Sequence, residues 1–442
     1  MAPLAVPTQP NSVTLRAAIG AVFAALALAG CGTTAASSAA SSASSSVGRS
    51  TPSPQNGAVG SPTTGSTAPS SSVRSPVVTA PPGSTTAKLI LGAGQVGTRE
   101  QIPWPAVGPG WFLVVSDSRR FDQNVASSGT QTLSLVDPQA GRYVVASWPS
   151  AGTPGGMDAL DLRAWSGDGR RALFGGLSPN VVELDLATGT RRTIGIGSHG
   201  TVGYTSPTGA NLVVSRPVEQ NGSVTGYTVV RVDSNGRGAA TLTSSPVPTG
   251  ITWLYTPDGS ALYLSGMGGI GEVSNAGGAL RSLPAVTTTD QQCRPVRWWD
   301  AASVVVNCSS AAGDRLWAVP TDGAPARALT PAPGGGDPVG YGYNDIVRVG
   351  ASTFLQHLDG CGVVSVGELD KSGSPHPFAV PGSLGNDKLI GASGGNLAIA
   401  SSADCAPTSW FGLVDPAAAR TVKVIPDVAG VVGIVAAMPF PR

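Results

Sequence analysis

Between residues 161 and 193, apolar and polar residues alternate over four short segments, which is the pattern of β-strands with one face more buried than the other. Each pair of segments is separated by a Gly-containing turn, and β-branched residues are frequent within them. These features predict two consecutive hairpins rather than a helix. The four strands are expected at 162–165, 171–174, 181–185 and 190–194.

The second of these hairpins recurs along the chain. Its third strand ends at an Asp or at the residue aligned with it, and the seven aligned positions are 137, 185, 233, 274, 320, 370 and 415. A four-stranded unit that recurs at roughly 40–50 residues is typical of a β-propeller. We therefore predict an all-β fold, a seven-bladed β-propeller over residues 87–442. Six or eight blades stay compatible with the sequence because three of the intervals carry irregular insertions.

The first hairpin also recurs, with Trp-Ser-Gly-Asp-Gly at 165–169, Thr-Ser-Pro-Thr-Gly at 205–209 and Tyr-Thr-Pro-Asp-Gly at 255–259. These turns resemble the TolB-type (WD40-like) propeller repeat, whose hallmark is Trp-Ser-Pro-Asp-Gly before an apolar strand. The resemblance implies a propeller, but not TolB's role, because the N-terminal domain of TolB has no counterpart here. The stretch 183–189 also resembles quinoprotein repeats, although only Trp148 matches their docking Trp.

Both ends of the predicted propeller carry one strand more than the repeat needs. An apolar run at 431–438 follows the last blade, and residues 88–92 resemble a fourth strand that precedes the first blade. Termini that share one sheet leave no open edge. We expect 431–438 to lie beside N-terminal residues of the propeller.

The N-terminus reads as an export signal. Arg16 precedes an apolar run of 14 residues, 17–30, which is shorter than the roughly 20 residues that a membrane span needs. The run ends in Leu-Ala-Gly-Cys, which resembles the bacterial lipobox. The resemblance implies cleavage after residue 30 and a diacylglycerol on Cys31, which would anchor the protein in the lipid bilayer. The alternative is an ordinary signal peptide with an unrelated Cys.

Residues 31–86 are almost entirely Ser, Ala, Thr, Pro and Gly after Cys31. Such a segment cannot bury enough apolar surface to fold, so we predict a disordered tether. A lipid-anchored protein with this tether would lie on the extracytoplasmic face of the cell membrane. The formal net charge of +1, with 12% charged residues, argues against a nucleic acid partner.

Four Cys remain after Cys31, an even number in an exported protein. Cys293 and Cys308 face each other across a hairpin that turns at residues 300 and 301, so we expect them to form a disulfide. Cys361 and Cys405 occupy matching places in neighbouring blades and form the second expected pair. Free or exchanged thiols are the alternative. A zinc site is not expected, because no CxxC or clustered His accompanies these residues.

No catalytic motif, metal site or cofactor signature is found. His199 lies in a loop between blades, where it is either a ligand residue or a solvated loop residue. Arg297 and Trp299 lie on one face of an inner strand, with Trp298 on the other, and serve either the core between blades or the floor of a ligand site. The remaining candidate binding residues lie in loops and are Tyr341, Asp359 and Asp404.

These observations predict a membrane-anchored extracytoplasmic propeller that binds an envelope protein or a glycan and carries out no chemistry. An assembly factor for other envelope proteins would differ from this only in its partner. The alternative is a propeller enzyme, a lyase or a dehydrogenase, with a shallow site in the central channel. That alternative predicts several Asp, His or Arg side chains converging in the channel.

Overall fold

The computed structural model describes residues 90–122, 125–126, 129–150, 162–175, 179–247, 251–286, 291–332, 342–359, 363–403, 409–428 and 431–441. The predicted signal peptide, Cys31 and the predicted tether lie outside these residues. The described part is all-β: its only helical segments are the 3-10 turns η1 (Arg99–Gln101) and η2 (Trp104–Ala106). None of the helical segments it describes is long and apolar enough to cross a membrane.

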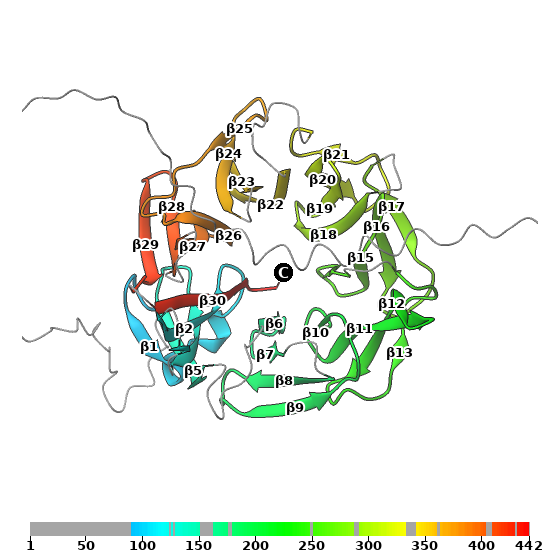
Figure 1. The fold of residues 1–442 in the computed structure, drawn as a ribbon, viewed down its shortest axis with the longest axis horizontal. Helices are drawn as coiled ribbons and strands as arrows, with labels where there is room; N and C mark the ends of the chain where they lie inside the picture. The colour runs from blue at the N-terminus through cyan, green and yellow to red at the C-terminus, as the bar shows by residue number, and fades with distance from the viewer. Residues whose placement is uncertain are drawn as a thin grey trace, which may run out of the picture. The chain divides into compact units, whose positions relative to one another are not determined.

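The described strands pair into seven four-stranded antiparallel units, which we number as blades 1 to 7 along the chain (Figure 1). Blade 2 contains the two hairpins expected between residues 161 and 193. Its strands are β6 (Leu162–Trp165), β7 (Arg171–Phe174), β8 (Asn180–Asp185) and β9 (Arg191–Gly195), which confirms the four expected segments within one residue at each end.

The other blades repeat this order from the inner to the outer strand. Blade 3 consists of β10 (Val202–Tyr204), β11 (Asn211–Gln220), β12 (Ser223–Asp233) and β13 (Ala240–Thr241). Blade 4 consists of β14 (Trp253–Tyr255), β15 (Ala261–Met267), β16 (Gly269–Ser274) and β17 (Arg281–Pro284). Blade 5 consists of β18 (Gln292–Trp298), β19 (Ser303–Ser310), β20 (Gly313–Pro320) and β21 (Arg327–Ala328).

Blade 6 consists of β22 (Gly342–Val349), β23 (Ser352–Leu358), β24 (Val364–Leu369) and β25 (Pro375–Pro377). Blade 7 consists of β26 (Gly385–Ser393), β27 (Asn396–Ala403), β28 (Ser409–Asp415) and β29 (Arg420–Ile425). Blade 1 takes its inner strand from the C-terminal end, β30 (Val431–Pro439), followed by β2 (Phe112–Asp122), β4 (Thr130–Val136) and β5 (Arg142–Pro149). The short β3 (Val125–Ala126) pairs with the end of β2.

The buried residues form one hydrophobic cluster between each two successive blades, the last one between blades 7 and 1. On β11, for example, Leu212 and Val214 pack toward blade 2, whereas Val213 packs toward blade 4. Side chains of a strand point alternately to its two faces, and here both faces are covered. This explains why the middle strands of the blades are apolar runs rather than strict alternations.

The first and last strands of the propeller lie in one sheet, in blade 1, as expected. β30 runs antiparallel to β2, with Phe112 opposite Pro439 and Leu113 opposite Met438. Beyond it, Phe440 packs edge-on against Trp165 of blade 2, with ring centroids 5.0 Å apart. The pairing removes the free edge that β2 would otherwise present.

The prediction of an N-terminal strand at 88–92 is wrong for residues 90–92, the part that the structure describes, because these residues form no strand. A turn closes there, with the Gln95 amide donating to the Gly92 carbonyl at 3.0 Å, and Leu91 is buried in the core. The chain reaches the sheet only at β1 (Val96–Thr98), which runs parallel to β5. The extra N-terminal strand therefore exists, but it starts later and lies on the outer edge of blade 1.

The Asp side chains of the Asp-Gly turns in the repeat form hydrogen bonds within the turn. In blade 2 the Arg170 amide donates to the Asp168 carboxylate at 3.0 Å, and the Ser166 hydroxyl donates to the same oxygen. The Gly that follows has a φ of +73°, a conformation that other residues adopt only at a cost. Asp258 makes the equivalent bonds in blade 4, and its hydrogen bonds from Thr256 and Ser260 lower its pKa to about 2.

Candidate functional site

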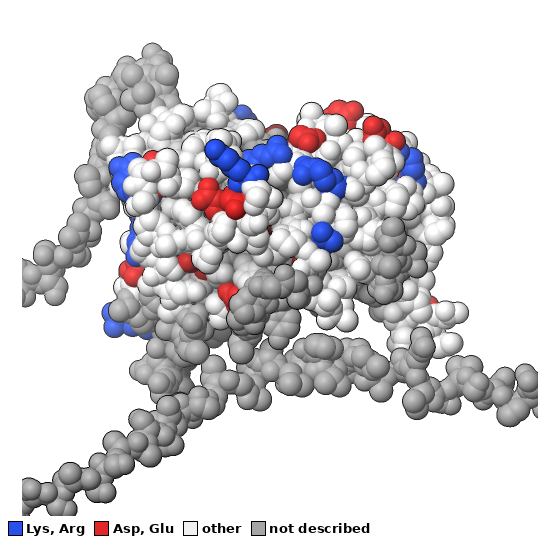
Figure 2. Space-filling view, turned by 90° about the horizontal axis from the view of Figure 1, so that it is seen from above, with Lys and Arg blue, Asp and Glu red and all other residues white. Residues whose placement is uncertain are grey.

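The turns after the first and third strands of every blade lie at the same end of the strands, because each blade is an antiparallel meander. We call the side of the propeller on which these turns lie the turn face. Figure 2 shows one side of the molecule, where Lys and Arg side chains, with Asp and Glu beside them, gather toward one edge. Most of the rest of that view is uncharged.

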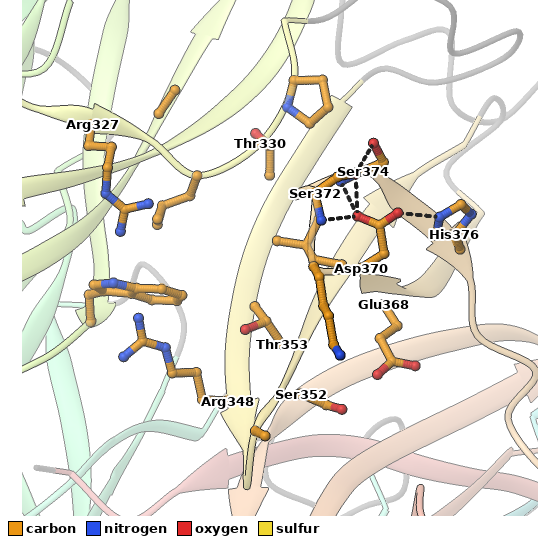
Figure 3. A pocket seen from close by; sticks show the side chains of 18 of the residues that line it. Arg327, Thr330, Arg348, Ser352, Thr353, Glu368, Asp370, Ser372, Ser374 and His376 are labelled. Atoms are coloured by element: carbon orange, nitrogen blue, oxygen red, sulfur yellow. Dashed lines mark hydrogen bonds and ion pairs between the residues drawn. The ribbon is translucent and has the colours of Figure 1, made fainter.

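A groove with a volume of about 1080 Å³ lies between blades 5 and 6 (Figure 3). It begins on the turn face, at the ends of the inner strands, and continues along β21. We call it the blade 5–6 groove. Its charged lining residues are Arg315, Arg327, Arg348, Glu368, Asp370 and Lys371.

Two of the groove's guanidinium groups are free to meet a ligand. Arg327 is exposed, and among the described residues it has no hydrogen-bond or ion-pair partner. Arg348 is also exposed, and it makes no ion pair with any residue that the structure describes. Its guanidinium carbon lies 3.6 Å from the centroid of the Trp299 ring. A guanidinium group over an aromatic ring can still offer its N–H donors to a ligand, because these donors lie at the edge of the group.

One of the two carboxylates that line the groove, that of Asp370, is already hydrogen-bonded within the turn in which it lies. The Asp370 carboxylate accepts bonds from the hydroxyl of Ser372, the backbone amides of Ser372 and Ser374, and the ring of His376 (Figure 3). The hydrogen bonds from Ser372, His376 and Ser374 hold the pKa of Asp370 well below its usual range. Asp370 is therefore the anchor of a turn, in the same way as the Asp residues at the equivalent positions of other blades.

A second pocket of about 240 Å³ adjoins the groove at the inner strands. We call it the channel pocket, because segments of blades 1, 4, 5, 6 and 7 line it. Trp299 and Arg348 line both cavities. Its other lining residues are mainly apolar, and Arg297 and Arg348 are the charged ones among those the structure describes there.

Arg297 reaches the channel and meets an acidic partner. Its Nε donates to Asp345 Oδ1 at 2.7 Å, and its Nη2 pairs with the other carboxylate oxygen. Trp298 turns the other way: its Nε1 donates to the Tyr255 carbonyl at 2.9 Å, and its ring packs against Tyr263. The adjacent Trp299 packs in the cluster between blades 5 and 6. The opposite orientation of Trp298 and Trp299 agrees with the sequence expectation.

The two other candidate binding residues that the structure describes, His199 and Asp359, line neither the groove nor the channel pocket. His199 is buried, and its Nδ1 lies 3.0 Å from the Gly197 carbonyl oxygen, so the expectation of a solvated loop residue is wrong. The path of the chain between β9 and β10 places the His199 ring inside the protein. Asp359 pairs with His357 at 2.9 Å and accepts a bond from Ser365, on the opposite end of the strands from the turn face. Tyr341 and Asp404 lie outside the described residues.

The Cys293–Cys308 disulfide is present, between residues that face each other on β18 and β19. Cys361 and Cys405 lie outside the described residues, so their pairing stays a prediction. Among the residues that the structure does describe, no three His, Cys, Asp or Glu side chains gather in a way that could hold a metal ion.

The sequence reasoning missed Arg327, Arg348 and Lys371. Arg348 had a usable signal, because it is the one charged residue in the apolar end of β22, two positions after Ile346. Arg327 and Lys371 had none: both lie next to turns, where a charged residue is ordinary, and only the packing of blade 6 on blade 5 brings them to one groove.

No protein-family model and no curated protein matches this chain. Solved structures with a similar fold include a prolyl endopeptidase, at 14% identity and a TM-score of 0.47, with 70% of this chain and 49% of that chain covered. They also include the putative TolB from Agrobacterium tumefaciens, at 18% identity and a TM-score of 0.40, with 57% and 89% covered. A third is the Cps50 (Swd1) β-propeller domain of Myceliophteria thermophila, at 13% identity and a TM-score of 0.44, with 66% and 94% covered.

The chain thus spans about half the length of the prolyl endopeptidase. A putative TolB and a β-propeller domain are thus among the solved structures with a similar fold. At this level of identity the similarity concerns the fold alone.

Proposed function

We propose that this protein is a membrane-anchored extracytoplasmic propeller that binds a protein or glycan partner in the blade 5–6 groove. The observation that carries the proposal is the pair of exposed guanidinium groups of Arg327 and Arg348, which lack an acidic partner among the described residues. Guanidinium groups at protein surfaces recognise carboxylates and phosphates through paired N–H donors. A groove lined by such groups suits binding.

The anchor is proposed from the sequence. A diacylglycerol on Cys31, with a third acyl chain or without one, supplies the two chains that stable membrane attachment needs. The tether of residues 32–86 would reach about 40 Å as a coil, from roughly 5–6 Å multiplied by the square root of the residue number. It would hold the propeller off the bilayer with its groove accessible.

The alternative of a lyase or dehydrogenase gains no specific support. It requires acid–base groups that converge in the channel. The channel pocket brings together Arg297 and Arg348, and Arg297 is already paired with Asp345.

Photo-cross-linking in cells tests the proposal. Ala351 is exposed and lines the groove, and Ala418 is exposed in the β28–β29 turn on the same face of blade 7. A benzophenone amino acid at position 351 should give a discrete adduct in the membrane fraction, and the same probe at position 418 should not. The adduct should disappear when Cys31→Ala releases the protein. No adduct at 351, or equal adducts at both positions, would contradict groove binding.

A further inference from the structure

We infer that the ligand of the blade 5–6 groove is a glycan chain that carries carboxylate groups, of the uronic acid type. The inference rests on the proposed function and specifies its ligand. Its basis is that the groove combines unpaired cationic side chains with free hydroxyl groups along an elongated path. The following features of the lining carry it.

Charge is the first feature. The groove is lined by three Arg and one Lys against two carboxylates, of which Asp370 is already engaged by its own turn. Arg315 is also partly engaged, because its Nε donates to the Thr330 carbonyl at 3.0 Å. Arg327, Arg348 and Lys371 remain, all exposed. Their charges complement a ligand with several negative groups rather than a neutral one.

The second feature is the arrangement of these charges. Arg348 comes from the inner strand β22, whereas Arg327 comes from the outermost strand of blade 5. Both guanidinium groups point into the same side of the pocket in Figure 3. The groove therefore receives one guanidinium group from the inner strand of blade 6 and one from the outermost strand of blade 5. A chain with a carboxylate on successive units can engage both.

The third feature separates a glycan from an acidic peptide. Ser352 and Thr353 line the groove, and among the described residues their hydroxyls have no hydrogen-bond partner. Two of the larger apolar lining residues offer little surface: Leu329 is 8% exposed, and one face of the Trp299 ring is covered by Arg348. Peptide recognition usually depends on apolar anchors that fill pockets. Carboxylates for the guanidinium groups, and hydroxyls for the Ser and Thr side chains, are what a uronic acid chain presents.

Calorimetric titration of the full chain, purified in mild detergent, tests the inference. The probes are oligogalacturonate, neutral dextran oligosaccharides of matched length, and poly-L-glutamate. The groove variant is Arg327→Gln with Arg348→Gln. The control is Arg170→Gln with Arg420→Gln, which removes two exposed Arg from turns on the same face of blades 2 and 7.

Three results together would support the inference. Oligogalacturonate should bind about tenfold or more weakly to the groove variant, and its binding to the control should be unchanged. It should also bind the wild-type protein more tightly than poly-L-glutamate does. Higher salt should weaken this binding. Equal or tighter binding of poly-L-glutamate would overturn the glycan assignment in favour of an acidic peptide. Equal losses in both variants, or no binding of any probe, would also overturn it. If the adduct at position 351 still forms in these cases, the proposed function survives with another ligand.

Discussion

Arg297 and Asp345 join the inner strands of blades 5 and 6 through a two-pronged ion pair. Arg297 Nε lies 2.7 Å from Asp345 Oδ1, and the second guanidinium nitrogen pairs with the other carboxylate oxygen. The Asp345 carboxylate also accepts the Ile346 amide at 2.7 Å. The two side chains are 26% and 18% exposed, so water competes for them only in part. This pair fixes the two blades that form the groove.

Asp345→Asn should therefore destabilise the propeller by about 1–3 kcal/mol, since it leaves a half-buried guanidinium without its counter-charge. The effect should fall short of the loss for a fully buried pair because water can reach Arg297. Urea denaturation of the single variants and of Asp345→Asn with Arg297→Met measures it. The double variant should lose less than the sum of the single variants. Additive losses would show that the pair does not stabilise the fold.

The strand quartet of each blade could be predicted because it is encoded locally. Period-two alternation and Asp-Gly turns fix a hairpin within about 20 residues, and the register of that hairpin follows from its turn, as the pairing of Cys293 with Cys308 shows. Ring closure could also be predicted, because one surplus strand at 431–438 needs a partner. The start of β1 was expected too early, although Gly92 and Gly94 mark the turn before it and Gly94 has a φ of +76°.

The groove depends on contacts between blades, which local patterns do not encode. Arg348 and Trp299 are 49 positions apart, and their stacking is decided by how blade 6 rotates against blade 5. The burial of His199 likewise depends on the path of a loop between blades. Residue type alone identified Trp299 and Arg297 as candidates, but only the structure shows that one lines a groove and the other is paired.

Asp117 should make the stability of blade 1 depend on pH. Burial by itself would raise the pKa of this carboxyl group, but hydrogen bonds from Ser150, the Arg119 amide and Gln131 outweigh burial and lower it. A lowered native pKa stabilises the fold above the unfolded pKa of about 4, and this contribution is lost as the pH falls through the native value.

Asp117→Asn should accordingly cost about 1–3 kcal/mol near pH 7, where the charged acceptor is lost. The difference between wild type and variant should shrink as the pH falls below about 4. Urea denaturation at a series of pH values between 7 and 2 measures it. A difference that stays constant over the whole range would mean that Asp117 acts through its shape rather than its charge.

The Cys293–Cys308 disulfide should stabilise blade 5. The two sulfur atoms are buried in the cluster between blades 4 and 5, and the bond closes a loop with a sequence separation of 15. Replacing both residues by Ala should cost about 3 kcal/mol by the loop-entropy estimate for this length. Thermal denaturation with and without reductant measures the effect.

Reductant should lower the wild-type midpoint toward that of the double variant. Any shift that reductant still causes in the variant would report on Cys361 and Cys405, which are expected to form the second pair. Equal midpoints for the wild type and the variant under oxidising conditions would contradict a stabilising role for the first disulfide.

Gly433 should be essential for the closure of the ring by β30. Its φ is +77°, and a Cβ there would lie 2.5 Å from the carbonyl oxygen of Ser409. Gly433→Ala should cost more than the roughly 1–3 kcal/mol of a left-handed conformation, because the clash with backbone adds to the strain.

The matched control is Gly394→Ala, where φ is +58° and no atom lies within 4 Å of the added Cβ. Urea denaturation should show a clearly larger loss of unfolding free energy for Gly433→Ala than for the control. Gel filtration should show that Gly433→Ala associates as its concentration rises, because a displaced β30 exposes the edge of β2. Equal losses in the two variants, with both proteins monomeric, would show that the closure tolerates a side chain at this position.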